Sequence, residues 1–315
     1  MKVLANDGIS ELGKSILSNA GFQVITDKVD QADLASYLNK EKIEILLVRS
    51  ATKVREDLIS QCPGLKLIGR GGVGLDNIDV AFAETKGIKV INTPASSSQS
   101  VAELVVGHMF ALSRFLYDSY KNMESQDFST LKKKYSKGIE LRGKTIGIVG
   151  FGRIGQSLAS YCLGMGMKVI AFDQSPFNVV IPMEIGSQKI NLEVSTNMNL
   201  MDKLGELDFI SLHVPKQKDG SAVITKESFD KMKNGVRIVN AARGGVIDES
   251  DLLDAIKNGK VAACALDVFE NEPNPRQDLL SNASIASTPH IGAATLEAQD
   301  RIGEELAQKI IEQFG

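Results

Sequence analysis

The chain has 315 residues, of which 43% are hydrophobic and 24% are charged, and its formal net charge is −3. This length suits about two domains of ordinary size, and the composition is typical of a soluble globular protein. So small a net charge gives no reason to expect nucleic acid or an anionic membrane as a partner. The three cysteines (Cys62, Cys162 and Cys264) lack metal-ligand spacing, and no apolar run reaches membrane-spanning length. We therefore expect no metal site and a cytoplasmic protein.

Residues 1–94 alternate short apolar runs with amphipathic segments, a pattern that predicts βαβαβ order and a doubly wound parallel sheet. In such sheets, binding groups lie beyond the carboxyl ends of the strands. Two of these ends carry candidate substrate-binding residues: Arg49 and Ser50 after IEILLV, and Gly72, Val73 and Gly74 after LKLIGR. A glycine-rich loop there presents backbone N–H groups to an anion, although a plain turn remains an alternative.

The segment Val101–Tyr120 reads as one long helix that is apolar on several sides, so we expect it at a domain or subunit contact. His108 within it is predicted to be a satisfied core group rather than a catalyst. The basic run Lys132–Lys137 is predicted to be a solvated face, and attraction of an anionic substrate is the less favoured alternative.

A short apolar run, Thr145–Val149, leads into a G-x-G-x-x-G frame formed by Gly150, Gly152 and Gly155. The first glycine allows the tight turn, the second lets a pyrophosphate approach the backbone, and the third lets helix and strand pack closely. A second apolar run then ends in Asp173. A carboxylate there accepts hydrogen bonds from an adenosine ribose and repels a 2′-phosphate, which predicts NAD rather than NADP as the cofactor.

The chain after Asp173 continues the alternation less regularly. The polar segment Asn178–Leu200 is predicted to be loops with a helical turn. The strands DFISLHVP, VRIVNA and VAACALDV then complete a second doubly wound sheet, and Leu296–Phe314 forms a closing helix.

Three strand ends in the second half carry candidate catalytic residues. Arg243 follows VRIVNA, and its guanidinium suits a substrate carboxylate. Glu272 follows VAACALDV, and His290 follows SIAS. A carboxylate bonded to a histidine stabilises the imidazolium, which donates a proton in reduction; the same pair serves as a base in oxidation. Spacing alone leaves open whether the three meet, and His213 is a rival acid that more plausibly lines the cofactor cleft.

The stretches GRGGVGLDNID, GFGRIG, NAARGGVIDESDLLDAI, ALDVFENEP and TPHIGAAT resemble, in that order, the signatures of the D-isomer-specific 2-hydroxyacid dehydrogenases. The resemblance covers nearly the whole chain. It implies that Arg243 binds substrate and that Glu272 supports His290 as proton donor. It also implies that the cofactor is held by Arg153, Ile154, Asp173, His213, Val214, Pro215, Ala241, Ala242, Arg243, Asp267, His290, Gly292, Ala293 and the glycine loop.

The resemblance further implies two domains around one active site. Residues 1–97 and 287–315 would form a flavodoxin-like substrate domain, and residues 98–286 a Rossmann NAD-binding domain. Arg49, Ser50 and the backbone of residues 72–74 would hold the anionic groups of the substrate. Val73 replaces a threonine found in some relatives, so only backbone contacts are expected there. A homodimer or homotetramer is expected, without the C-terminal regulatory domain that many relatives carry.

Within the family, the stretches VRSAT, GRGGVGLDNID and HIGAATLEAQ most resemble members that oxidise 3-phospho-D-glycerate to 3-phosphohydroxypyruvate at the entry to serine synthesis. The main alternative is a reductase of glyoxylate or hydroxypyruvate, or another D-2-hydroxyacid dehydrogenase. A more distant alternative is an NADH-sensing binding protein similar to the corepressors that resemble this family.

Overall fold

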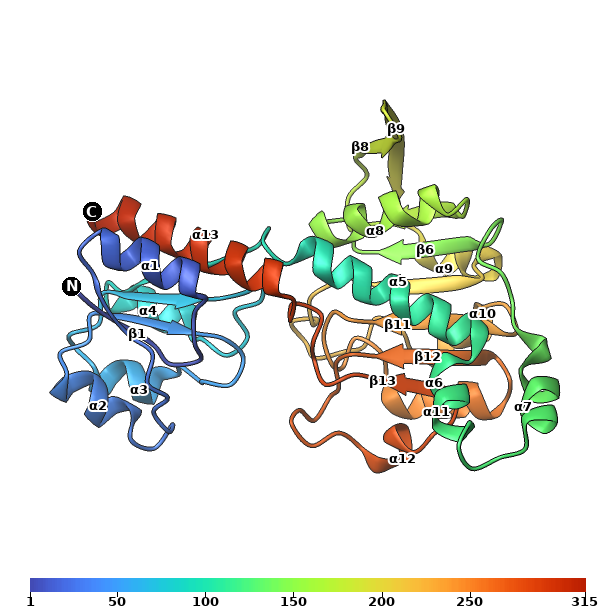
Figure 1. The fold of residues 1–315 in the computed structure, drawn as a ribbon, viewed down its shortest axis with the longest axis horizontal. Helices are drawn as coiled ribbons and strands as arrows, with labels where there is room; N and C mark the ends of the chain where they lie inside the picture. Colours follow the sequence, from blue (N-terminus) through green and yellow to red (C-terminus); the bar gives the residue numbers. More distant parts are fainter. The chain divides into compact units, whose positions relative to one another are not determined.

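The structure is a computed structural model that describes the backbone of residues 1–315 and every side chain except that of Ile185. The chain forms two compact units, one built from residues 1–100 and 293–315 and the other from residues 101–292 (Figure 1). The second unit thus extends past the expected boundary at 286. The reason is that β13 (Ile285–Ser287) pairs in parallel with β12 (Val261–Leu266), which keeps the following loop with this sheet.

Unit 1 contains a five-stranded parallel sheet with strand order β2-β1-β3-β4-β5, which is the flavodoxin-like order. Its elements are β1 (Lys2–Ala5), α1 (Glu11–Asn19), β2 (Gln23–Ile25), α2 (Leu34–Lys40), β3 (Ile45–Val48), α3 (Glu56–Gln61), β4 (Leu67–Arg70), α4 (Val80–Thr85), β5 (Lys89–Asn92) and α13 (Leu296–Phe314).

Both faces of this sheet are buried, so successive strand residues serve different cores. On one face, Val3 and Ala5 of β1 pack with Leu17 of α1 and with Ala307 and Ile310 of α13. On the other face, Leu4 and Leu46 pack against α2, α3 and α4 through residues such as Leu34 and Leu58. Helix α13, the last of the chain, therefore lies beside α1, the first (Figure 1).

Unit 2 contains an eight-stranded sheet in which the segment β9-β7-β6-β10-β11-β12 has the Rossmann strand order. The strands are β6 (Thr145–Val149), β7 (Lys168–Phe172), β8 (Asn178–Ile185), β9 (Gln188–Asn197), β10 (Phe209–Leu212), β11 (Val236–Asn240), β12 and β13. The helices are α5 (Ser98–Arg114), α6 (Leu116–Asn122), α7 (Phe128–Lys134), α8 (Arg153–Gly164), α9 (Leu200–Lys203), α10 (Lys226–Lys231), α11 (Glu249–Lys257) and α12 (Gln277–Leu280), with 3₁₀ turns at 135–137 and 204–206. The prediction of two doubly wound α/β domains is confirmed.

The two faces of the second sheet carry separate cores. Val105 and Met109 of α5 and Leu158 of α8 pack over one face of the sheet. Leu252 of α11 and Leu279 of α12 pack over the other. The thiols of Cys162 and Cys264 are fully buried and free, as is that of Cys62 in unit 1.

The prediction of loops between Asn178 and Leu200 is wrong, because this segment forms the antiparallel hairpin β8–β9, with a turn at Gly186 (φ 61°). Its apolar residues alternate along each strand, with Ile181 and Met183 on one and Ile190, Leu192 and Val194 on the other. This period of two is the signal of a half-buried strand, and the polar residues between them obscured it. The end of β9 pairs in parallel with the end of β7 at the edge of the sheet. The rest of the hairpin projects away from unit 2 (Figure 1).

The predicted single helix Val101–Tyr120 is also wrong. Phe115 adopts a left-handed conformation (φ 56°) that ends α5 and starts α6 in a new direction. The lysine run lies at the end of α7 and in the 3₁₀ turn that follows. Among the described residues, no helix is both long and apolar enough to cross a membrane.

Candidate active site

The glycine loop between β6 and α8 has the geometry of a phosphate-binding turn. Gly150 has φ 91°, and a Cβ there would lie 2.5 Å from the carbonyl oxygen of His213. A Cβ on Gly155 would lie 2.4 Å from the carbonyl oxygen of Gly150. A Cβ on Gly152 would meet nothing within 4 Å, and no side chain caps the helix at this residue. The backbone N–H groups of Arg153 and Ile154 at the start of α8 therefore suit an anion.

Asp173 follows β7 and is tied to this loop. Its Oδ2 accepts a hydrogen bond from the amide of Phe151 at 2.8 Å, and its Oδ1 accepts one from the amide of Gln174 at 2.8 Å. The carboxylate is thus oriented by the backbone of the glycine loop. The loop, the uncapped helix start and the acidic strand end fit a dinucleotide such as NAD.

His213 lies at the end of β10, beside Gly150. Its Nε2 lies 2.8 Å from Oγ of Ser211, whereas its Nδ1 is buried without a hydrogen-bond partner. Burial lowers the pKa of His213 to about 4, so the imidazole is neutral near pH 7. The single N–H of a neutral imidazole is far too weak an acid to transfer its proton in reduction, which makes His213 a poor rival acid. Val214 and Pro215 follow His213 directly after β10.

Glu272 and His290 form a hydrogen-bonded pair in which Nδ1 of the histidine lies 2.8 Å from Oε2 of the glutamate. Both side chains are about one-third exposed, at 36% and 35%. Burial would raise the pKa of Glu272, but hydrogen bonds from His290 and from the Phe269 amide, with the charge of Arg243, lower it below its ordinary value. The pair leaves Nε2 of His290 as the ring nitrogen for proton transfer.

Arg243 belongs to a tight loop after β11. Asn240 holds this loop, because its side chain donates to the carbonyl of Arg243 (2.9 Å) and accepts from the amide of Ala242 (3.1 Å). Nη1 of Arg243 donates to the carbonyl of Ala242 at 2.7 Å. A Cβ on the following Gly244 would lie 1.8 Å from the carbonyl of Phe269, so this loop packs directly against the segment that leads to Glu272.

Asp267 at the end of β12 is only 1% exposed. Its carboxylate accepts hydrogen bonds from the amides of Ile291 and Gly292, each at 2.9 Å, and from the hydroxyl of Thr288 at 2.6 Å. The acidic residue that the resemblance placed at the cofactor therefore also organises the His290 loop.

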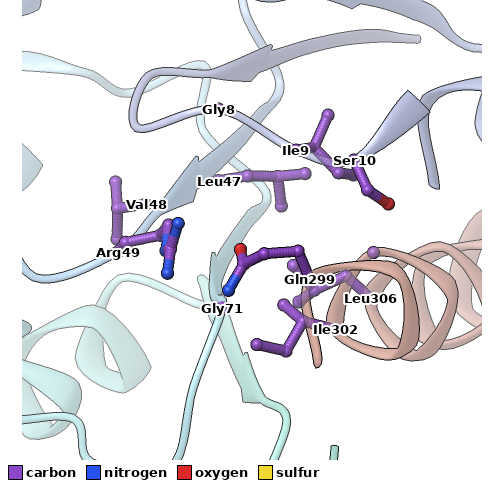
Figure 2. Close-up of a pocket in the computed structure, with 11 residues that line it drawn as sticks. Gly8, Ile9, Ser10, Leu47, Val48, Arg49, Gly71, Gln299, Ile302 and Leu306 are labelled. Carbon is purple, nitrogen blue, oxygen red and sulfur yellow. The ribbon is translucent and has the colours of Figure 1, made fainter. Parts of the chain in front are cut away.

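In unit 1, the loop of Arg49 and Ser50 is held from two sides. Oδ2 of Asp7 accepts the amides of Arg49 (2.7 Å) and Thr52 (3.1 Å), and the side chain of Asn77 donates to the carbonyls of the same two residues. Figure 2 shows Arg49 and Gly71 lining a small cavity together with Gln299 of α13.

Sequence reasoning missed Asp7 and Asn77. The available signal was the position of Asp7, which lies two residues beyond β1 at the same edge of the sheet as Arg49.

The candidate substrate loop at 72–74 lies beyond β4. Gly72 has φ 146°, and a Cβ there would lie 1.8 Å from Nη1 of Arg70. Val73 is 38% exposed, and its carbonyl accepts a hydrogen bond from the side chain of Asn92. Among the described side chains, no group of three or more histidine, cysteine or acidic residues is arranged to hold a metal ion.

Comparison with known proteins identifies the family of the chain. Residues 106–292 match the family model described as "D-isomer specific 2-hydroxyacid dehydrogenase, NAD binding domain". The chain belongs to the D-isomer-specific 2-hydroxyacid dehydrogenase family. It is an oxidoreductase whose second unit is the NAD-binding domain.

The individual proteins that the chain resembles differ in their named activities. The chain is 42% identical to a hydroxypyruvate reductase of Thermotoga maritima, over 100% of this chain and 98% of that protein. It is 40% identical to a D-3-phosphoglycerate dehydrogenase of Methanocaldococcus jannaschii over 98% of this chain, which spans only 57% of that longer protein. The apo structure of an Escherichia coli D-lactate dehydrogenase superposes with a TM-score of 0.78 at 28% identity, covering 98% of this chain and 96% of that chain.

Proposed function

We propose that the protein oxidises 3-phospho-D-glycerate to 3-phosphohydroxypyruvate, reversibly and with NAD, as the first step of L-serine biosynthesis. The observation that carries the chemistry is the 2.8 Å contact between His290 and Glu272. Bound NAD supplies the hydride acceptor. Nε2 of His290 takes the proton of the C2 hydroxyl during oxidation and returns it during reduction, and the Glu272 carboxylate stabilises the imidazolium formed in between.

Arg243 has the role of substrate anchor. Its guanidinium binds the substrate carboxylate and, in reduction, stabilises negative charge that develops on the carbonyl oxygen. The Asn240 hydrogen bonds that fix its loop support this role, because they limit the number of positions that the guanidinium can reach.

The cofactor contacts follow the family pattern. The pyrophosphate is assigned to the loop Gly150–Gly155 with Arg153 and Ile154, and the adenosine ribose to Asp173. The nicotinamide half is assigned to His213, Val214, Pro215, Ala241, Ala242, Arg243, His290, Gly292 and Ala293. Asp267, which the resemblance also implies as a cofactor residue, is assigned to the nicotinamide carboxamide.

The substrate phosphate is assigned to Arg49 and Ser50 together with the backbone amides of Gly72, Val73 and Gly74. Support comes from the fixed backbone of the Arg49 loop, which Asp7 and Asn77 hold in place. Reduction of hydroxypyruvate or glyoxylate is the second candidate, and the similarity to the Thermotoga hydroxypyruvate reductase along its whole length favours it.

A homodimer or homotetramer is the proposed assembly. Several large apolar side chains on and beside α5, α6 and α7 of unit 2 are exposed, namely Phe110, Tyr120, Met123 and Phe128 at 42–88%. Exposed apolar side chains of this kind suit contact with a second copy of the chain. Three buried free thiols fit the reducing environment of the cytoplasm.

The deciding experiment compares initial rates of NADH oxidation with 3-phosphohydroxypyruvate, hydroxypyruvate, glyoxylate and pyruvate. The proposal requires the highest kcat/KM for the phosphorylated acid. Arg49→Ala should then reduce turnover of that substrate alone, whereas Lys53→Ala, which removes an exposed charge nearby, should not. Equal loss on all acids would move the protein to the reductase branch. Tight NADH binding without turnover of any acid would indicate a binding protein.

A further inference from the structure

His108 of α5 is buried (1% exposed), yet both nitrogens of its ring have partners. Nδ1 lies 3.3 Å from the hydroxyl of Tyr117, and Nε2 lies 3.2 Å from Oγ1 of Thr288. Thr288 follows β13, two residues before His290. A histidine that the sequence predicts to be a core group therefore contacts the segment that carries the proposed proton donor.

The directions of these hydrogen bonds can be assigned. Oγ1 of Thr288 donates its single hydroxyl proton to Oδ1 of Asp267 at 2.6 Å. The same hydroxyl must then accept from Nε2–H of His108. Burial lowers the pKa of His108, which favours the neutral ring. With its proton on Nε2, this ring accepts a hydrogen bond from the Tyr117 hydroxyl at Nδ1. Four side chains therefore form one directional hydrogen-bond network, which runs from Tyr117 through His108 and Thr288 to Asp267.

This hydrogen-bond network ends at Asp267, the residue that shapes the loop of His290. Three consecutive amides, those of His290, Ile291 and Gly292, all donate to Asp267: the first to its backbone carbonyl and the other two to its carboxylate. His290 itself has a left-handed backbone (φ 54°), which is unfavourable for a side chain with a Cβ and needs support from its surroundings.

We infer that His108 and Thr288 are positioning residues for His290 and act through the Asp267 carboxylate. The inference rests on the proposed role of His290 and extends it to residues that do not touch substrate. With His108 in place, the threonine hydroxyl has one orientation and Asp267 one position. Without it, the hydroxyl rotates, the carboxylate loses its fixed donor, and the loop that presents His290 to Glu272 relaxes.

The test compares His108→Leu, Thr288→Val and the double variant. We expect each single variant to lower kcat by about tenfold, because small displacements of a catalytic group are costly, with little change in the KM for NADH. The double variant should be no slower than the slower single variant, since both break one chain. His108→Gln, whose side-chain amide can donate to Thr288, should recover most of the rate.

Val105→Ala is the matched control, because Val105 is fully buried on the same helix and is one turn away. It should lower the melting temperature without lowering kcat. If Val105→Ala slows turnover as His108→Leu does, or if the losses at 108 and 288 add, the effect is general packing and the inference is wrong.

Hydrogen exchange of the amides of residues 290–292 gives a readout that does not depend on catalysis. His108→Leu should accelerate exchange there by about tenfold or more, and His108→Gln should not. Unchanged protection in His108→Leu would overturn the inference. Turnover by His290→Ala at the wild-type rate would instead overturn the proposed function, and the exchange result would still stand by itself.

Discussion

Oε1 of Glu272 accepts the backbone amide of Phe269 at 3.0 Å, while Oε2 of the same carboxylate holds Nδ1 of His290. One carboxylate thus links the loop after β12 to the loop after β13. The hydrogen bond from the Phe269 amide restricts the rotamer of the Glu272 side chain. The second carboxylate oxygen, Oε2, is therefore already directed at the imidazole of His290. The histidine and the glutamate therefore act as one unit.

His290→Ala should lower kcat by roughly 100-fold or more, since general acid–base catalysis contributes about that factor. The affinity for NADH, measured by fluorescence titration, should change little. Glu272→Gln should lower kcat as well, and the double variant should lose no more than His290→Ala alone. A fully active His290→Ala variant would show that another group transfers the proton.

The Glu272–His290 pair predicts that the folded protein loses stability in acid. The pKa of Glu272 in the folded protein is lower than its ordinary value, so the stability gained from the pair is fully present above the ordinary value near 4.5. That stability is lost as the pH falls through the lower folded pKa. Denaturant unfolding should therefore separate wild type from Glu272→Gln at pH 7, and the difference should shrink below about pH 4.

Arg243→Ala should raise the KM for the acid substrate and lower kcat together, because the guanidinium acts in both binding and the transition state. Arg243→Lys should recover only part of the loss, since an ammonium group lacks the planar fork of two donors. The KM for NADH is measured beside these constants, and it should rise less than the KM for the acid, because Arg243 is only one of several residues assigned to the nicotinamide half. A change confined to the KM for NADH would assign Arg243 to the cofactor rather than the substrate.

Asp173→Ala should weaken the preference for NAD over NADP. It removes the carboxylate that would bind the ribose hydroxyls and repel a 2′-phosphate. It also removes the acceptor of the Phe151 amide, so a general loss of affinity for both cofactors is expected beside the change in their ratio. The ratio of kcat/KM for the two cofactors is the quantity to compare, and an unchanged ratio would contradict the assignment.

His213 predicts a loss of stability in acid. Burial holds its folded pKa near 4, whereas the unfolded chain titrates near the ordinary 6.5. The unfolded state therefore binds more protons between these values, and stability falls as the pH drops from 6.5 to about 4. The full effect is at most about 3 kcal/mol. Thermal melts of His213→Gln should show a shallower decline over this interval, and an equal decline would mean that the imidazole is protonated in the fold.

Sequence patterns predicted the two sheets because parallel strands buried on both faces read as continuous apolar runs. Such runs are clear in IEILLV and TIGIV. The glycine loop, Asp173 and the pair Glu272–His290 could be located because each lies just after a strand. Their distances could not be predicted, since spacing along the chain does not fix where neighbouring loops turn.

Two predictions of secondary structure failed because the local sequence pattern did not reveal the structure. In β8–β9 the alternating apolar residues are separated by Pro182 and by charged residues on the exposed face, so the segment read as polar. The break at Phe115 involves neither glycine nor proline and leaves no mark in the sequence. At the hairpin and at Phe115, tertiary contacts rather than local sequence determine the backbone conformation.

Helix α13 packs against α1 at a point where neither helix has a side chain. A Cβ on Gly13 would lie 2.7 Å from the backbone of Gly303. Helix α13 also supplies Ala307 and Ile310 to the core over β1 and β3. During synthesis, the face of the first sheet that α13 covers therefore stays uncovered until residues some 200 positions later have been made. All of residues 101–292 leave the ribosome before that face is covered, so the NAD-binding unit can fold first although its sequence begins second.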